Sequence, residues 1–429
     1  MYSLAFSILF VSFIILTLLV RFWLASRHIR HVLSHRNAVP AEFAEKIPLA
    51  AHQKAADYTV ARTKFGLLTL LVNTLVLVGF TLLGGLQWMS VEIFKLTGPG
   101  MVYQLALLAA FALVSGVIDL PFDYYKQFGM EQRFDFNKMS RGLFFGDMLK
   151  GVLLGAAIGL PLAWVMLTLM EKSGNLWWLY AWLVWSGFQL LMMVLFPTVI
   201  APLFNKFTPL EDQSLKARIE GLMGRVGFAS KGLFVMDGSK RSAHGNAYFS
   251  GFGANKRIVF FDTLLSRLQP QEIEAVLAHE LGHFKLKHII KRIVMMFALS
   301  LGFLALLGYL KTQLWFYTGL GVDPLVLAGQ NNDAMVLLLF MLVLPVFTFL
   351  FGPLTSISSR KHEFEADAFA AQHTDARDLV SALVKMYEDN ASTLTPDPLH
   401  SAFYDSHPPA SVRIRHLNLA TTGSMAVPA

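Results

Sequence analysis

A short run of the sequence, His279-Glu280-Leu281-Gly282-His283, joins two histidines and a glutamate at a spacing suited to metal chemistry. Histidines four residues apart lie on one face of a helix, so each can direct a ring nitrogen at the same zinc ion. The glutamate beside the first histidine then reaches a water molecule at the metal as a general base. Zinc lowers the pKa of such a water towards 7, which supplies a nucleophile at neutral pH. The run predicts a hydrolase that holds one zinc ion per chain.

The third ligand is expected from an acid on another element, because the chain contains no cysteine. A metalloprotease pattern with three histidines needs a glycine at position 286 and a histidine at position 289, and the chain has Leu286 and Ile289 there. That class is therefore excluded. His288 is expected to lie at the surface or at the membrane edge.

Two acids on a later predicted helix are the candidates for this third ligand. Glu363 and Asp367 are four residues apart and share a helical face. One can bind the metal while the other hydrogen-bonds a ligating histidine and orients its ring, and the spacing leaves both assignments open. Glu365 points away from that face and is expected to be solvated or to pair with a base.

The elements around the histidine run indicate a small α+β segment over residues 206–292. Pro270 suits the first position of the helix that carries the run. Short stretches rich in β-branched and aromatic residues predict strands, and a further helix is expected before them. The predicted strands are 232–236, 247–249 and 257–261, and the predicted helix is about 213–227.

The rest of the chain is divided by its charge pattern. Only 15% of the 429 residues are charged, against roughly 25% in a soluble protein. Seven stretches of at least 18 residues contain no Asp, Glu, Lys or Arg, and about 20 apolar residues span a bilayer as a helix. These predicted spans lie near 1–20, 65–91, 96–118, 151–170, 173–205, 293–310 and 334–359. A soluble protein, a β-barrel and a disordered chain are excluded.

The lysines and arginines orient these spans. With the N-terminus outside, the inside segments hold 33 of the 36 basic residues, as the positive-inside rule requires. The chain then divides into a five-span membrane part (1–205), the cytoplasmic-side segment 206–292, a two-span hairpin (293–359) and a C-terminal cytoplasmic segment (360–429). The two spans of the hairpin cross the membrane outward and back again. The histidine run before them and the acid pair after them therefore both lie on the cytoplasmic side. The net charge of +7 thus reports orientation and contact with the lipid bilayer, and it gives no support to a nucleic-acid partner.

With these features the sequence resembles the type I CAAX prenyl protease family. Its members are integral-membrane zinc endopeptidases that process prenylated CAAX proteins. The resemblance covers nearly the whole chain, and these motifs carry it: residues 123–137 with Phe134-Asp135-Phe136-Asn137, Ser242 to Phe249, the HELGH run, Ser359 to Phe369, and His407-Pro408-Pro409. It implies a polytopic α-helical membrane protein whose seven transmembrane helices enclose a chamber, with a zincin-like α+β metalloprotease domain on the cytoplasmic side. It also implies that His279, His283 and Glu363 bind zinc while Asp367 supports a histidine.

The resemblance implies the substrate contacts as well. The backbone of an extended peptide would pair with an edge strand that includes Asn246, Ala247, Tyr248 and Phe249. Asn246, His407 and Arg413 would flank the scissile peptide, with His407 and Arg413 stabilising the oxyanion. Plainer alternatives stay open: Asn246 as a turn residue, His407-Pro408-Pro409 as a helix start, and Arg413 as the partner of an acid.

The substrate itself is left open by the sequence. The compact length and the absence of an endoplasmic-reticulum retention signal suit a bacterial member in the inner membrane, and most bacteria do not prenylate CAAX proteins. Peptides of CAAX type, with or without an isoprenoid, are one expectation, and general membrane-protein quality control without a prenyl requirement is the alternative. The oligomeric state, the number of cleavages and the route of the substrate stay unassigned.

Other classes fit less well. A shorter heat-shock-type membrane zinc protease lacks the N-terminal spans. A transporter or channel predicts ionisable residues inside the spans, and a non-catalytic zinc scaffold has no need of Glu280. An endopeptidase with Glu280 as its base is the favoured function.

Overall fold

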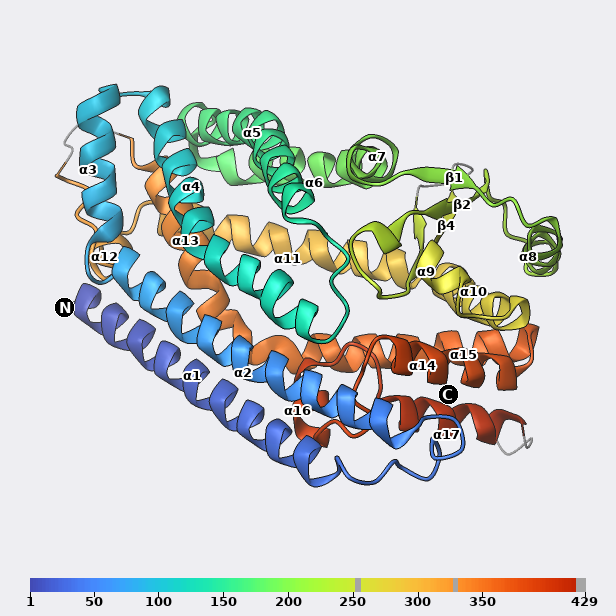
Figure 1. Ribbon diagram of the computed structural model, residues 1–429. Helices are drawn as coiled ribbons and strands as arrows, with labels where there is room; N and C mark the ends of the chain where they lie inside the picture. The colour runs from blue at the N-terminus through green and yellow to red at the C-terminus, as the bar shows by residue number, and fades with distance from the viewer. Residues whose placement is uncertain (251–255, 327–330, 422–429) are drawn as a thin grey trace.

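The computed structural model describes residues 1–250, 256–326 and 331–421, and long helices dominate it (Figure 1). The helices are α1 (Tyr2–Ser34), α2 (Leu49–Phe80), α3 (Gly85–Thr97), α4 (Met101–Tyr125), α5 (Arg141–Lys172), α6 (Trp177–Leu195), α7 (Ala201–Phe204), α8 (Gln213–Arg225), α9 (Asp262–Leu265), α10 (Pro270–Lys285), α11 (His288–Leu310), α12 (Leu314–Thr318), α13 (Asp333–Thr348), α14 (Gly352–His373), α15 (Ala376–Asp389), α16 (Pro398–Tyr404) and α17 (Ala410–Thr421). The strands are β1 (Phe207–Pro209), β2 (Leu233–Met236), β3 (Ala247–Ser250) and β4 (Arg257–Phe261).

Within the described ranges, seven helical segments are long and apolar enough to cross a membrane, which confirms the predicted number. They are α1, α2, α4, α5, α6, α11 and α13, of which α4, α6 and α13 run on into further helical turns. The uncharged stretch 65–91 is not one helix, however. α2 ends at Phe80, Gly84 adopts a left-handed conformation with φ of 77°, and α3 starts at Gly85. Glycine tolerates this backbone without strain, so the chain turns where the charge pattern shows no break.

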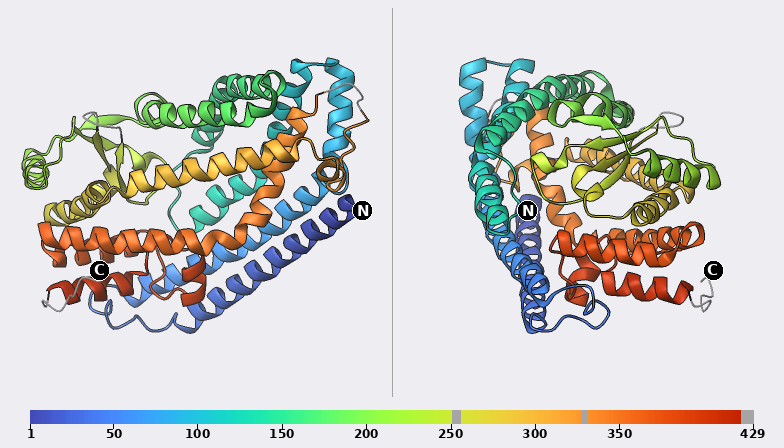
Figure 2. Two further views of the ribbon diagram at one scale, coloured as in Figure 1. Left: turned by 180° about the vertical axis from the view of Figure 1, so that it is seen from behind. Right: turned by 45° about the vertical axis from the view of Figure 1, so that its right-hand side comes forward.

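The membrane helices form a closed ring. Contacts link α1 to α2, α4 to α5, α5 to α6, α6 to α11, α11 to α13, and α13 back to α1, while Phe65 and Phe80 of α2 contact aromatic rings of α4. Seen from the side in Figure 2, right, the blue to teal helices stand in a curved wall. A cavity of about 740 Å³ is lined by α1, α2 and residues between 387 and 409.

The α+β lobe lies at one end of this ring, beside the C-terminal helices (Figure 1). Its sheet has the strand order β1-β2-β4-β3, with β2 and β4 parallel and β3 antiparallel to β4 at an edge. The three predicted strands and the predicted helices at 213 and 270 are confirmed. β1 was not predicted, because three residues ending in proline carry no alternating pattern.

Two separate hydrophobic cores support the two parts. One lies among the membrane helices, with Phe10, Leu107 and Leu339 fully buried. The other joins α8, the sheet, α10, α15 and α17, with Ile219 and Leu281 at its centre. α14 continues from the end of α13 and packs along α10. It therefore ties a membrane helix directly to the lobe.

Polar contacts hold α10 in the lobe. Glu272 is buried and accepts hydrogen bonds from the Gln269 backbone N–H, from Ser381 Oγ at 2.7 Å and from Lys385 Nζ at 2.8 Å. Glu274 pairs with two arginines of α8 at 2.6 and 2.7 Å. A buried carboxylate is stable only when such partners replace its water. These contacts fix α10 on two sides.

Gly282 sets the distance between α10 and α14. A Cβ placed at this position would lie 3.1 Å from Ala366 Cα and 3.1 Å from Phe369 Cβ. Both contacts involve atoms at or next to the backbone, which cannot rotate away. Glycine is therefore required here for the close approach of the two helices.

We expect Gly282→Ala to lower the apparent melting temperature of the purified protein in detergent, because overpacking between two fixed helices costs about 1–3 kcal/mol. Gly224→Ala is the matched control: it also lies in a helix, and a Cβ there meets nothing within 4 Å. Alanine is favoured over glycine in helices by roughly 0.5–1 kcal/mol, so this control should be neutral or stabilising. Thermal unfolding followed by tryptophan fluorescence measures both. An equal shift for the two variants would contradict the close-packing argument.

Candidate functional site

Three potential ligand groups from α10 and α14 converge on one point. His279 Nε2 and His283 Nε2 lie 3.3 Å apart. The two carboxylate oxygens of Glu363 lie 3.4 Å from His279 Nε2 and 3.4 Å from His283 Nε2 respectively. The three residues are buried or half-buried. Helical periodicity aligns the two histidines, and the Gly282 contact brings α14 close enough for Glu363 to face them.

These separations fit a tetrahedral metal ion. Ligand bonds of about 2.0–2.1 Å at tetrahedral angles place neighbouring ligand atoms roughly 3.3 Å apart. Moreover, Glu363 Oε2 is buried without a hydrogen-bond partner, an arrangement that a buried carboxylate rarely keeps unless a cation satisfies it. The residues present therefore fit a metal.

Asp367 and Arg413 hold His279 from behind. Asp367 Oδ1 lies 2.8 Å from His279 Nδ1, so that nitrogen donates and Nε2 faces the ligand cluster. Burial lowers the pKa of His279, but the carboxylates of Asp367 and Glu363 outweigh it and raise that pKa to about 9. A metal ion that binds at Nε2 therefore displaces a proton.

Arg413 is itself buried against the same acid. Its Nε and Nη2 donate to the two oxygens of Asp367 at 2.9 and 2.6 Å, and its Nη1 lies 3.8 Å from Glu363 Oε2. Burial opposes the charge of Arg413, but the two carboxylates outweigh it and raise its pKa. The structure thus shows the acid-pairing alternative for Arg413.

His283 has a second support that the sequence did not suggest. Its Nδ1 lies 3.0 Å from His288 Nδ1, and His288 Nε2 lies 2.8 Å from Glu365 Oε2. With His283 Nε2 turned to the ligand cluster, its Nδ1 donates to His288 Nδ1, and His288 Nε2 then donates to Glu365. His288 is only 1% exposed, so the expectation of a surface position was wrong, although it does stand at the start of the membrane helix α11.

His288, His362 and Glu365 also form a second group of potential ligand atoms. The rings of His288 and His362 are stacked, with centroids 4.1 Å apart and planes 13° from parallel. Ring nitrogens bind metals in the plane of the ring, so two parallel stacked rings do not point at one ion. The hydrogen-bond chain to His283 explains this group better than a second metal does.

Glu280 and His407 stand at the open side of the cluster. Within the described part of the chain, Glu280 makes no hydrogen bond or ion pair, so its carboxylate is free to act on water. His407 Nε2 lies 3.4 Å from Glu363 Oε1, and its Nδ1 is 2.9 Å from Ser406 Oγ. The surrounding protein lowers the pKa of His407 by desolvation, with Arg413 and His279 adding to the effect and Glu363 opposing it. A neutral imidazole at this place can donate one hydrogen bond.

The predicted substrate-binding residues lie on the edge strand. Ala247, Tyr248 and Phe249 pair with β4 on one side, and among the described residues no strand pairs with β3 on the other. Phe249 contacts Phe284 of α10 with ring centroids 4.9 Å apart, which fixes the strand next to the histidine helix. Asn246 precedes the strand, and its side-chain oxygen accepts from the Ala247 N–H at 2.8 Å.

A metal-ligand triad beside a free carboxylate, carried by a seven-helix membrane ring, defines a membrane metallopeptidase. Comparison with known proteins agrees. Residues 28–206 match the family model for the CAAX prenyl protease N-terminal region with five membrane helices, and residues 209–421 match the model for peptidase family M48. The chain belongs to this family.

Individual relatives cover most of the chain. The CAAX prenyl protease 1 homolog of Arabidopsis thaliana is 40% identical over 323 residues, which are 74% of each chain. CAAX prenyl protease 1 of Saccharomyces cerevisiae is 34% identical over 410 residues, 89% of this chain and 88% of that one. The crystal structure of S. mikatae Ste24p superposes with a TM-score of 0.89 at 31% identity, covering 96% of this chain and 98% of that one.

We expect His288→Ala to weaken metal binding about 10- to 100-fold, the usual loss when a residue that orients a ligand is removed. Competition with a chelator of known affinity, using the purified protein in detergent, measures it. Glu365→Ala leaves His288 in place and should weaken binding less. The matched control is His373→Ala, also on α14, whose Nδ1 faces only the Phe369 carbonyl oxygen at 2.8 Å. Unchanged metal affinity in His288→Ala would show that the hydrogen bonds from His283 through His288 to Glu365 do not support metal binding.

Proposed function

We propose that this protein is a zinc endopeptidase that hydrolyses peptide bonds near the C-terminus of CAAX-type membrane-associated substrates. The observation that carries this proposal is the convergence of His279, His283 and Glu363 at 3.3–3.4 Å beside the unpaired Glu280. Two imidazoles and a carboxylate with a fourth position left open are the ligand set of catalytic zinc. When bound, zinc supplies a Lewis acid that polarises the scissile carbonyl and activates water.

Each residue then has a role that its position supports. Glu280 takes the proton of the attacking water and passes it to the leaving amine. His407, neutral and open to the cavity, donates a hydrogen bond to the oxygen on which negative charge develops. Asp367 fixes the tautomer of His279. Arg413, whose donors are occupied by Asp367, acts mainly by holding that acid and by balancing the charge of Glu363.

The edge strand offers the means of holding an extended peptide. The unpaired edge of β3 presents backbone N–H and C=O groups to which a substrate adds as a further strand. Asn246 is exposed at its start and is suited to hydrogen-bond the substrate backbone. Tyr248 and Phe249 add apolar surface on the two faces of the strand.

The names of the relatives and the charge pattern support the substrate and the location. The relatives are CAAX prenyl proteases, so CAAX-type peptides, isoprenylated or not, are the first substrates to test. We place the N-terminus outside and the segments 206–292 and 360–429 on the cytoplasmic side of the membrane. The relatives reported above are eukaryotic, and a bacterial inner membrane stays a prediction.

We expect Glu280→Gln to lose about 10²–10⁴-fold in kcat, the usual contribution of a general base, while its bound zinc stays unchanged. Glu280 is not a ligand, and glutamine keeps the shape of the side chain. Peptide cleavage and elemental analysis of the same purified sample measure the two quantities. The control is Glu220→Gln, an exposed position on α8. Full activity in Glu280→Gln with zinc retained would exclude the mechanism.

The prenyl requirement is tested by one CAAX peptide with and without its isoprenoid. If the chain is a prenyl-dependent protease, kcat/KM for the isoprenylated form is expected to be at least tenfold higher, because the lipid contributes buried apolar area at about 25 cal/mol per Å². Equal cleavage of the two forms would leave the peptidase in place and favour general membrane-protein quality control.

A further inference from the structure

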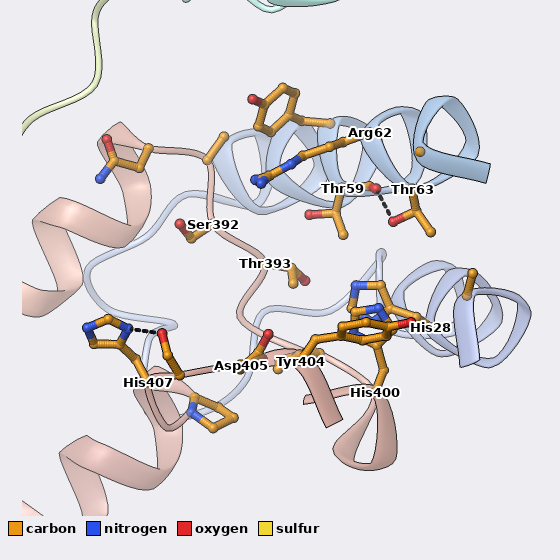
Figure 3. A pocket seen from close by; sticks show the side chains of 18 of the residues that line it. His28, Thr59, Arg62, Thr63, Ser392, Thr393, His400, Tyr404, Asp405 and His407 are labelled. Atoms are coloured by element: carbon orange, nitrogen blue, oxygen red, sulfur yellow. Dashed lines mark hydrogen bonds between the residues drawn. The ribbon is translucent and has the colours of Figure 1, made fainter. Parts of the chain in front are cut away.

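The cavity between α1, α2 and residues 387–409 carries more positive than negative charge. Its described lining includes Arg21 of α1 and Arg62 of α2, and Asp405 is the one acid among the lining residues. Figure 3 shows Arg62 extending from α2 into the cavity, with His407 on the opposite wall. His400 also lines the cavity, and burial lowers its pKa, so it adds no charge at neutral pH. The cavity therefore favours an anionic group.

Neither arginine pairs with an acid in the described part of the chain, and Arg62 is the more exposed of the two. Arg21 stacks on the ring of Phe349, with its Cζ 4.3 Å from the ring centroid. Arg62 is exposed, and no residue in the described part of the chain pairs or hydrogen-bonds with it. A guanidinium offers five N–H donors in a planar fork that matches a carboxylate. The guanidinium of Arg62 is therefore accessible to an anionic ligand in the cavity.

Two residues of the cavity wall contact the metal cluster and the segment that leads into the edge strand. His407 lines the cavity, and its Nε2 lies 3.4 Å from Glu363 Oε1. Asn390 lines it too, and Asn390 Oδ1 accepts from the Gly245 N–H at 3.3 Å, two residues before β3 begins. The start of β3, rather than its end, is thus the side joined to the cavity.

The direction of a bound peptide follows from this arrangement. A peptide antiparallel to β3 runs from the Ser250 end to the Ala247 end, so its C-terminal residues leave the strand beside Asn246 and Asn390. A parallel peptide would send its N-terminus there. Only the antiparallel orientation brings a negatively charged chain end to the cavity that holds Arg62.

We propose that this cavity binds the C-terminal residues of the substrate and that Arg62 pairs with their free α-carboxylate. The inference rests on the proposed function and names the group that the site recognises. A cavity of 740 Å³ is about 11 Å wide if it is round, and three extended residues span about 10 Å. A C-terminal tripeptide released by one cut therefore fits between His407 and the opposite wall.

The test compares one isoprenylated CAAX-type peptide as the free acid and as the C-terminal amide. We expect the wild type to cleave the acid about 10- to 100-fold more efficiently, chiefly through a lower KM, since hydrogen bonds to charged groups have this strength. Arg62→Gln should cleave both forms at the rate of the amide, and Arg62→Lys should keep part of the preference. The matched control, Lys64→Gln, removes one positive charge from an exposed position on α2 that does not line the cavity, and it should keep the full preference.

Two results would overturn the proposal: equal cleavage of acid and amide by the wild type, or an unchanged preference in Arg62→Gln. A slowing of both peptides by the same factor in Arg62→Gln is one form of the second result, and it indicates a general effect such as binding of an anionic lipid headgroup. Glu280→Gln is run in parallel. Its loss of activity on both peptides supports the peptidase mechanism whatever Arg62 does, so the two proposals fail separately.

Discussion

The close contact between α10 and α14 is the constraint on which the rest of the structure depends. Two ligand groups stand on α10 and the third on α14, 80 residues later in the chain, and their atoms must meet within a few tenths of an ångström for a metal to bind. Gly282 lets the helices approach, and Ala366 presents the smallest possible surface from the other side. Because α14 continues from α13, the same contact also fixes the lobe on the membrane ring. A displacement between the two parts would therefore open the metal site.

Around the cluster, each histidine is held by its own chain of hydrogen bonds. His279 donates to Asp367, which Arg413 clamps with two bonds, and His283 leads through His288 to Glu365. Every such group is costly to bury alone, and each is buried together with a partner. The two chains leave both Nε2 atoms facing the same point. This arrangement orients the ligand side chains before a metal binds, so metal binding costs little conformational entropy.

The sequence could predict those features that follow from local pattern. The uncharged stretches predicted the seven membrane helices, and the spacing of His279 and His283 predicted a shared helix face. Patterns of this kind could not show the turn at Gly84, since an apolar helix and an apolar turn have the same composition. Nor could these patterns show that His288 contacts His283, because residues five apart lie on different faces of a continuous helix. The chain reaches it only because Lys287 adopts a left-handed conformation between α10 and α11.

The helix α2 belongs partly to the apolar membrane ring and partly to the wall of the polar cavity. At 1.5 Å per residue its 32 residues are about 48 Å long, far more than the bilayer core of about 30 Å. The uncharged second half faces lipid and its neighbours. The first half places Thr59, Arg62 and Thr63 along the cavity. Arg62 and Thr63 follow Thr59 by three and four residues, so both lie near it on one side of the helix. α2 thus presents polar side chains to the cavity from a helix that is otherwise apolar.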